Sequence, residues 1–373
     1  MIALPPLAPV TAWVLALLAV LILPAGRIEG TGVGLVAGGE ATMVAAIGLA
    51  AAAGGLVLGR RPALAGPLMA IGGILTGLVL LLRIRDGLVF EGSPWAVAAV
   101  IVAVVVLLWR AMEQIGSHGG PPGRVIVPVL FGGLLVYLWE VACLGFEVPQ
   151  VLLPAPSLIA ASISENLYTL GQDFNQTFFK AVIPGYVLGC GAGFLVAVSI
   201  DRSPFLQRGL LPLGSLISAM PIVGLAPIMV MWFGFDWQSK AAVVVVMTFF
   251  PMMVNTLAGL QAAGAMERDL MRSYAASYPQ TLAKLRLPAA MPFVFNALKL
   301  NSTLALIGAI VAEFFGTPIL GMGFRISTEV QRLNVDFVWA TIAVAAVAGS
   351  ASYGSLALIE RAVTFWHPSH RRS

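Results

Sequence analysis

Long apolar stretches separated by short polar segments make up most of the chain. A helix needs roughly 20 apolar residues to cross the hydrocarbon core of a bilayer, so each long apolar stretch predicts a membrane span. Strands of a membrane barrel would alternate polar and apolar residues, and these stretches do not alternate. The pattern therefore predicts an all-α, polytopic membrane protein with about ten spans, at residues 10–25, 41–58, 63–82, 95–109, 125–146, 178–200, 210–233, 241–260, 293–315 and 338–358.

Composition supports the same class of protein. Hydrophobic residues make up 59% of the 373 residues and charged residues only 10%, whereas soluble domains carry roughly 25% charged residues. Most of the outer surface must therefore face lipid. The net charge of +4 is small and spread over many loops, so it does not indicate binding to nucleic acid.

Basic residues predict how the chain is oriented in the membrane. If the N-terminus is cytoplasmic, the inner segments carry twice as many Lys and Arg residues as the outer segments. Inner loops of membrane proteins are enriched in these residues. The segment 147–177 contains neither Lys nor Arg, which independently favours an outer position. We therefore expect both termini to be cytoplasmic.

The chain divides into two parts near residue 120. Residues 1–120 are rich in Ala, Gly and Leu and end in the Gly/Pro-rich breaker 119–123. From residue 121 onward the loops are more polar and several spans contain proline. We predict an accessory N-terminal extension of four spans (1–120) and a core of six spans (121–373).

The sequence lacks the motifs of common catalytic sites. It contains no Gly-x-x-x-x-Gly-Lys-[Ser/Thr] loop, so ATP-driven work would require a separate ATPase. Neither His-Glu-x-x-His nor Gly-x-Ser-x-Gly occurs. Cys143 and Cys190 lie in apolar runs and are interpreted as buried packing residues. We expect no cofactor, no metal and no enzymatic activity.

One long polar segment, 261–292, interrupts the predicted core. It combines charged residues with apolar residues at helical spacing. Pro279 is expected to break or kink it, and the segment is expected to end at Leu287 and Pro288. An amphipathic helix here suits docking on a cytoplasmic partner, and equally suits a helix lying in the lipid headgroup region.

This segment resembles the cytoplasmic loop of binding-protein-dependent ABC importer permeases. The family pattern has Glu-Ala-Ala, three residues, Gly, and about a dozen residues before Leu-Pro. Counting back from Leu287–Pro288 places Asp269 at the Glu position, Leu270 and Met271 at the Ala positions, and Ala275 at the Gly position. Because Ala replaces Gly, the tight turn of the family is in question at this point.

Further motifs resemble the sulfonate, taurine and nitrate branch of that family, in order and at compatible spacing. The amino-acid sequence of residues 269–275 is similar to that of family members that carry thiamine-precursor pyrimidines or riboflavin. The motifs are Leu-Trp-Glu at 138–140, Leu-Pro-Ala-Pro at 153–156, Ser-Ala-Met-Pro-Ile-Val-Gly-Leu-Ala-Pro at 218–227, Phe-Phe-Pro-Met-Met-Val-Asn-Thr at 249–256, Leu-Pro-Ala-Ala-Met-Pro at 287–292 and Ala-Glu-Phe-Phe-Gly at 312–316.

The resemblance implies a type I importer in a bacterial inner membrane. Two permease copies would form the pathway, a dimer of cytoplasmic ABC ATPases would drive it, and an external substrate-binding protein would deliver a small organic solute or anion. A single six-span core would pair most simply with a copy of itself. Coupling to the ATPase is then expected at Asp269, Arg272, Ser273, Tyr274, Ala275, Leu287 and Pro288.

Polar residues and prolines inside the spans are candidates for lining the pathway. An ionised carboxylate is costly in lipid, so such a group faces a cavity or a partner, and a structural hydrogen bond between helices is the favoured interpretation. Asn255 is expected to satisfy backbone freed by Pro251. The candidates are Glu140, Pro221, Pro227, Met231, Asn255 and Glu313.

An ATP-independent secondary transporter is the alternative. Such transporters are often built from two inverted halves, and the halves of this chain show no such symmetry. The substrate and the role of the first four spans stay open.

Overall fold

A computed structural model describes residues 62–85, 94–118, 120–218, 220–316 and 319–366. These residues form helices joined by short connections. The chain separates into two compact units, Met1–Leu158 and Ile159–Ser373, which are described one at a time. The expected spans 10–25 and 41–58 lie outside the described residues, and the division into 1–120 and 121–373 stays a prediction.

Seven helical segments of the described chain are long and apolar enough to cross a membrane. They correspond to seven of the predicted spans, and α10 is a shorter apolar helix within an eighth. The segments are Ala65–Leu82, Val100–Ser117, Pro122–Gly145, Leu167–Ile200, Trp237–Gln261, Tyr278–Glu313 and Val335–Val363.

The described residues of the first unit include three long helices, α3 (Pro62–Arg85), α4 (Pro94–His118) and α5 (Gly120–Gly145). Helix α4 continues well beyond the predicted limit at residue 109. Its buried face includes Val104, Leu108, Met112 and Ile115, which follow one another at intervals of four and three residues. Polar residues follow residue 109 in α4, so the apolar stretch in the sequence is shorter than the helix. Helix α6 (Pro156–Glu165) begins in this unit.

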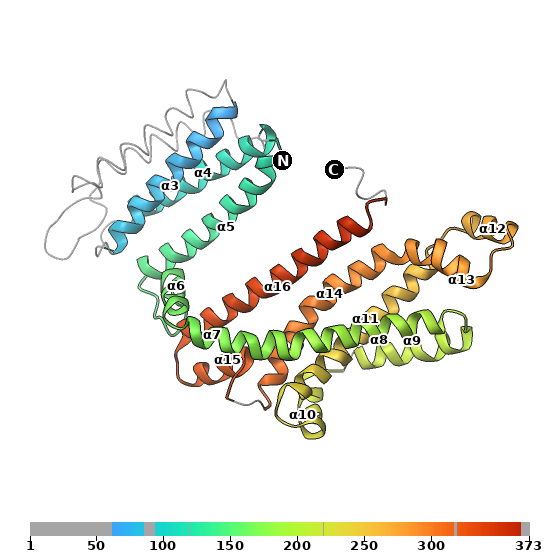
Figure 1. The fold of residues 1–373 in the computed structure, drawn as a ribbon. Coiled ribbons are helices and arrows are strands. Elements are labelled where there is room, and N and C mark those ends of the chain that lie inside the picture. The colour runs from blue at the N-terminus through green and yellow to red at the C-terminus, as the bar shows by residue number, and fades with distance from the viewer. Residues whose placement is uncertain (1–61, 86–93, 119, 219, 317–318, 367–373) are drawn as a thin grey trace. The chain divides into compact units, whose positions relative to one another are not determined.

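The second unit is built around three closely packed spans, α8, α11 and α14, with α11 packed against both of the others (Figure 1). Helices α12 and α13 lie at one end of this unit, and α7 and α15 lie at the other. Its elements are α7 (Leu167–Phe174), η2 (Asn175–Val182), α8 (Ile183–Ile200), α9 (Pro204–Ser218), α10 (Ile222–Phe233), α11 (Trp237–Gln261), α12 (Ala265–Ser273), α13 (Tyr278–Thr281), η3 (Leu282–Arg286), α14 (Leu287–Glu313), α15 (Met322–Gln331) and α16 (Val335–Val363).

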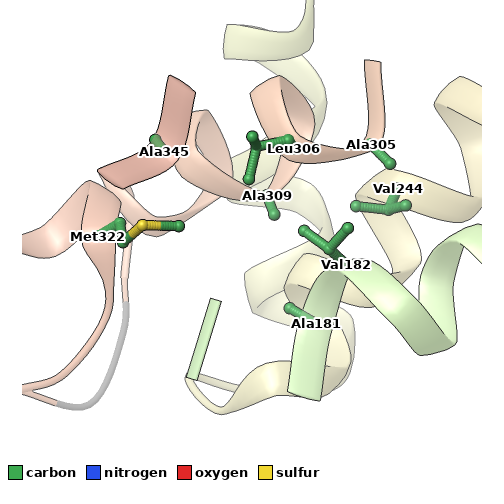
Figure 2. Packing of buried hydrophobic residues seen from close by; sticks show 8 residues of the cluster. All are labelled: Ala181, Val182, Val244, Ala305, Leu306, Ala309, Met322 and Ala345. Carbon is green, nitrogen blue, oxygen red and sulfur yellow. The ribbon is translucent and has the colours of Figure 1, made fainter. Parts of the chain in front are cut away.

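Small residues permit the close packing in this unit. Gly185, Gly189 and Gly193 lie on one face of α8, and a methyl group added to Gly185 would come within 2.7 Å of the Ala241 carbonyl oxygen of α11. Such close contact of two helices is the usual role of glycines four residues apart in membrane proteins. The adjoining core is made of Ala, Val, Leu and Met side chains from five elements (Figure 2).

In the part of the chain that the structure describes, both π-helical segments end two residues before a proline. Proline lacks an N–H group, and in an α-helix its ring crowds the carbonyl four residues earlier. Before Pro184 and Pro288 the helix widens, so the N–H of Ile183 bonds to Phe178 and that of Leu287 bonds to Leu282, each five residues back. The helix therefore passes through each proline without a break.

This geometry corrects two expectations for the polar segment. Pro279 does not break a helix, because it lies in the first turn of α13, where its missing N–H needs no partner. Leu287 and Pro288 do not end a helix either, since Tyr278–Glu313 is one continuous helical run of 36 residues. The break lies at residues 274–277, between α12 and α13.

The predicted span 210–233 is two helices rather than one. Helix α9 ends at Ser218, and α10 begins after Pro221, whose backbone is extended with φ −67° and ψ 126°. Proline disfavours helical backbone at the residue before it, which favours a break at this position. Pro227, by contrast, lies inside α10.

Candidate coupling helix and polar sites of the spans

Helix α12 (Ala265–Ser273) is the most exposed helix of the polar segment, and none of its side chains is buried. Glu267 lies in its first turn and Arg272 in its last turn, so both charges complement the helix dipole. The helix is short and has no apolar core of its own. Its sequence is therefore better explained by a surface that contacts another molecule than by packing within this chain.

An apolar stripe runs along α12. Met266, Leu270 and Tyr274 are 83%, 56% and 79% exposed, and residues four apart lie on the same face of a helix. We call these three residues the α12 stripe. Clustered exposed apolar side chains indicate a binding surface.

The predicted coupling residues Asp269, Arg272 and Ser273 also lie on α12, at different positions relative to the stripe. The Arg272 guanidinium lies 3.2 Å from the Asp269 carboxylate, with both side chains exposed. The Ser273 hydroxyl donates to the Asp269 carbonyl at 3.0 Å. At about 100° per residue, Arg272 lies opposite the stripe, whereas Asp269 and Ser273 flank it.

Ala275 ends α12 in the conformation that glycine usually supplies. Its φ is +52°, its N–H donates to the Arg272 carbonyl, and the N–H of Ala276 donates to that of Met271. These two bonds are those of a Schellman motif with Ala275 at its left-handed position. The turn that was in question without glycine is therefore present.

Leu287 and Pro288 are separate from this exposed segment. They are the first two residues of α14 and are half-buried. The predicted coupling residues thus divide into an exposed group on α12 and a pair within the long helical run.

Asp201 and Arg286 form a polar site that the motif analysis missed. The Arg286 guanidinium makes two bonds to the Asp201 carboxylate, at 2.5 and 2.8 Å, and its Nε donates to the Leu260 carbonyl at 2.9 Å. The Tyr278 hydroxyl donates to the same carboxylate at 2.8 Å. No local pattern signals this contact, since 85 residues separate Asp201 from Arg286.

Glu140, a candidate pathway residue, is buried in the first unit and has structural partners there. Its carboxylate lies 3.3 Å from the guanidinium of Arg85 at the end of α3. Its other oxygen accepts the N–H of Ser157 in the first turn of α6, at 2.9 Å. Glu140 therefore joins α3, α5 and α6.

Glu313, the other buried carboxylate among the candidates, holds the start of α15. It accepts the Thr177 hydroxyl at 2.8 Å and the Gly323 N–H at 2.7 Å. Asp173, which the motif analysis missed, accepts the Gly321 N–H at 2.9 Å and the Arg325 Nε at 2.7 Å. Two carboxylates from α14 and α7 thus satisfy backbone donors at one helix end.

Lys240 is a further buried charged residue that sequence reasoning did not single out. The residue is 1% exposed, and its ammonium group donates to the Phe235 carbonyl at 2.6 Å. Its position in the first turn of α11, next to polar residues, resembled that of an exposed loop residue in the sequence.

The remaining pathway candidates are distributed over α10 and α11. Pro221 caps α10, Pro227 lies within it, and Met231 is largely exposed. Asn255 donates to the carbonyl of Pro251 at 2.8 Å. Pro251 deprives the Met247 carbonyl of its usual helical partner, so Asn255 does not satisfy the backbone group that we expected.

A cavity of about 560 Å³ lies against α7 and α16 of the second unit. Its walls are apolar, and none of the six pathway candidates lines it. The lining residues are Ile163, Leu167, Leu170, Gly171, Phe174, Ala343, Val344, Val347, Ala348 and Ala351.

Comparison with known proteins agrees with the motifs. Residues 185–365 match the family of binding-protein-dependent transport system inner membrane components. A probable ABC transporter permease protein of Haemophilus influenzae is 30% identical over 220 residues, which are 59% of this chain and 89% of that protein.

Two further relatives cover a similar part of this chain. A putative aliphatic sulfonates transport permease protein of Bacillus subtilis is 27% identical over 65% of this chain and 88% of its own length. A formylaminopyrimidine transport permease protein of Halalkalibacterium halodurans is 28% identical over 65% of this chain and 96% of its own length.

Members of this family are multi-pass inner-membrane transport subunits that work with an ATPase and a substrate-binding protein. Their similarity supports the importer and gives no support to the secondary transporter. The helical fold, the broken apolar spans and the exposed α12 agree with this assignment. The chain therefore belongs to the binding-protein-dependent permeases and is the membrane-spanning subunit of an ATP-binding-cassette importer.

Proposed function

We propose that α12 is the coupling helix through which this permease docks on a cytoplasmic ATPase. The α12 stripe is the observation that carries the proposal, because Met266, Leu270 and Tyr274 are exposed on one face of a helix that buries nothing within its own chain. Burial of this stripe in a groove of a partner would remove apolar surface from water.

The connection between α12 and the spans suits the transmission of movement. The segment resumes at Tyr278 as a helical run that continues to Glu313 on the opposite side of the unit. Closure of the ATPases on ATP would displace the docked α12 and shift the spans between two arrangements. Such coupling requires only that the nucleotide favours one of two pre-existing states.

The assembly that we propose contains two copies of this chain, two ATPases and an external binding protein. Helix α10 supports the pairing of copies, because Val223, Met231 and Trp232 are exposed apolar residues on it. In this arrangement α12 and both termini face the cytoplasm, as the distribution of Lys and Arg favours. Residues 1–120 are an extension to the six-span permease core.

The proposed cargo is a small organic solute or anion, of the class that includes sulfonates, nitrate and pyrimidine precursors. Its support is the similarity to permeases named for aliphatic sulfonates and formylaminopyrimidine. Calorimetric titration of the cognate binding protein with an aliphatic sulfonate, nitrate and a formylaminopyrimidine tests this. Binding of none of them would refute the proposed class.

Co-purification tests the docking proposal. The chain is expressed with its cognate ATPase, and the parent is compared with Asp269→Arg combined with Tyr274→Glu, which places charges beside and within the stripe. We expect a stable complex with the parent and none with the double variant. Arg268→Gln, on the face opposite the stripe, is the matched control and should retain the complex.

Two results would contradict this proposal. An undiminished complex in the double variant, with normal membrane insertion, would show that the ATPase docks elsewhere. Absence of a complex with the parent would show that this pair of proteins does not form the importer.

A further inference from the structure

The polar segment contacts the end of α8 through an ion pair between Arg286 and Asp201. Asp201 follows the last residue of α8, and its side chain is 1% exposed. Arg286, in η3, makes two parallel bonds to its carboxylate. Paired bonds of this kind fix the relative orientation of both groups as well as their distance.

Three further contacts bring other residues to this point. The third bond of Arg286 reaches the Leu260 carbonyl near the end of α11. Tyr278 at the start of α13 donates to Asp201, and the Arg202 guanidinium stacks on its ring at 4.4 Å from the ring centre. We call Asp201, Tyr278 and Arg286 the brace.

The rest of the polar segment has little else to hold it. None of the side chains of α12 and α13 is buried. In the described chain, the hydrogen bonds that connect side chains of residues 265–286 to other elements all go to Asp201 or Leu260. The orientation of the segment therefore depends on very few groups.

We infer that Asp201 and Arg286 are positioning residues that make the polar segment move as one body with the inner ends of α8 and α11. A force applied to α12 then reaches the spans through the brace instead of bending the exposed connections on either side of α12. This inference rests on the proposed role of α12 as the docking helix. Arginine suits the position because lysine offers only one point of contact to a carboxylate.

Pulsed electron paramagnetic resonance of the full chain in lipid nanodiscs tests the inference. Spin labels are placed at Ser199→Cys on α8 and Arg268→Cys on α12, both of which are exposed and outside the brace and the stripe. The native Cys143 and Cys190 are buried, and labelling of the chain without added cysteines measures their background.

The parent should give one narrow distribution of distances between the two labels. Asp201→Asn and Arg286→Gln should each broaden it, Arg286→Lys should restore part of the narrowing, and Tyr278→Phe should broaden it less because the ion pair remains. Glu113→Gln, which removes an ion pair of α4 in the first unit, is the matched control and should leave the distribution unchanged. Circular dichroism and size-exclusion chromatography confirm that each variant is folded.

The same labels in the complex with the ATPase separate positioning from mere stability. Addition of ATP and vanadate should leave the distance unchanged in the parent, since both labels belong to one moving body. In folded Asp201→Asn the added nucleotide should shift the distance, because α12 moves without α8.

Folded Asp201→Asn and Arg286→Gln variants that keep the narrow distribution of the parent would overturn the inference. The brace variants leave the stripe intact, so they should still co-purify with the ATPase. If the brace variants broaden the distribution but the parent binds no ATPase, the positioning role stands and the proposed docking function fails.

Discussion

Truncation of the α12 stripe gives the most quantitative test of how the permease binds its ATPase. Met266→Ala combined with Leu270→Ala removes two apolar side chains and keeps helix propensity high, because Ala is the best helix former. Full burial of a Leu or Met side chain contributes about 1.5–3 kcal/mol. Since Met266 is 83% exposed and Leu270 is 56% exposed, docking would bury most of the first and about half of the second.

The double truncation should therefore cost about 2–4 kcal/mol of binding free energy. Each 1.4 kcal/mol is tenfold in the dissociation constant, so binding should weaken at least about 30-fold. The contact is apolar, and salt screens only charges, so the parent should bind almost as well at high ionic strength as at low ionic strength.

Microscale thermophoresis of the permease in nanodiscs with labelled ATPase measures both effects. Arg268→Ala, on the opposite face of the same helix, is the control and should bind like the parent. A double variant that binds within about twofold of the parent would refute burial of the stripe. Steep weakening with salt would show instead that the charged residues of α12 dominate the contact.

Three further predictions concern the stability of the second unit. Ala275→Gly should stabilise the end of α12 by about 1 kcal/mol, because the left-handed conformation costs an alanine roughly 1–2 kcal/mol and a glycine almost nothing. Hydrogen exchange at the backbone amides of residues 275 and 276 should therefore slow, and faster exchange would contradict the Schellman turn. Gly189→Ala should lower the thermal unfolding temperature, since its methyl group would overlap Thr248 of α11, whereas Gly191→Ala in the same helix meets open space and should not. Equal effects of the two glycine variants would contradict the packing of α8 on α11. Glu313→Leu leaves the Thr177 hydroxyl and the Gly323 N–H without their acceptor and should cost about 2–6 kcal/mol, against a smaller loss for Glu313→Gln, as measured by unfolding in detergent.

Glycine spacing and amphipathicity are signals that the sequence displays directly. Gly185, Gly189 and Gly193 recur every four residues, and the structure packs them against α11. The polar segment alternates charged and apolar residues at helical spacing, and it contains the exposed helix α12. The sequence was less informative about the effect of prolines on the helices. A predicted span is interrupted at Pro221, whereas the helix continues through Pro288 because a π-helical turn precedes it. Both are prolines in apolar runs, and the difference depends on the backbone around them.

The buried charged residues show a second limit on what could be predicted from the sequence. Glu140 and Glu313 stood out because carboxylates are rare in apolar runs, but their partners Arg85 and Thr177 lie 55 and 136 residues away in the chain. Asp173, Asp201 and Lys240 lie beside polar residues in the sequence and looked like ordinary residues at the ends of spans. The burial of these side chains became visible only when helices distant in the chain were packed together.

The sequence alone determined the family motifs and the approximate positions of the spans in the described chain, because the length and apolarity of a stretch decide whether it can cross a bilayer without help from other segments. The division of 210–233 into two helices was visible only in the structure. The tertiary structure decided which charged groups meet, as in the contact of Asp201 with Arg286 and Leu260. It also decided that the α12 stripe is left uncovered by the described chain. Contacts of this kind depend on the relative placement of whole helices, and the energy of a buried ion pair is set by that geometry rather than by the local sequence.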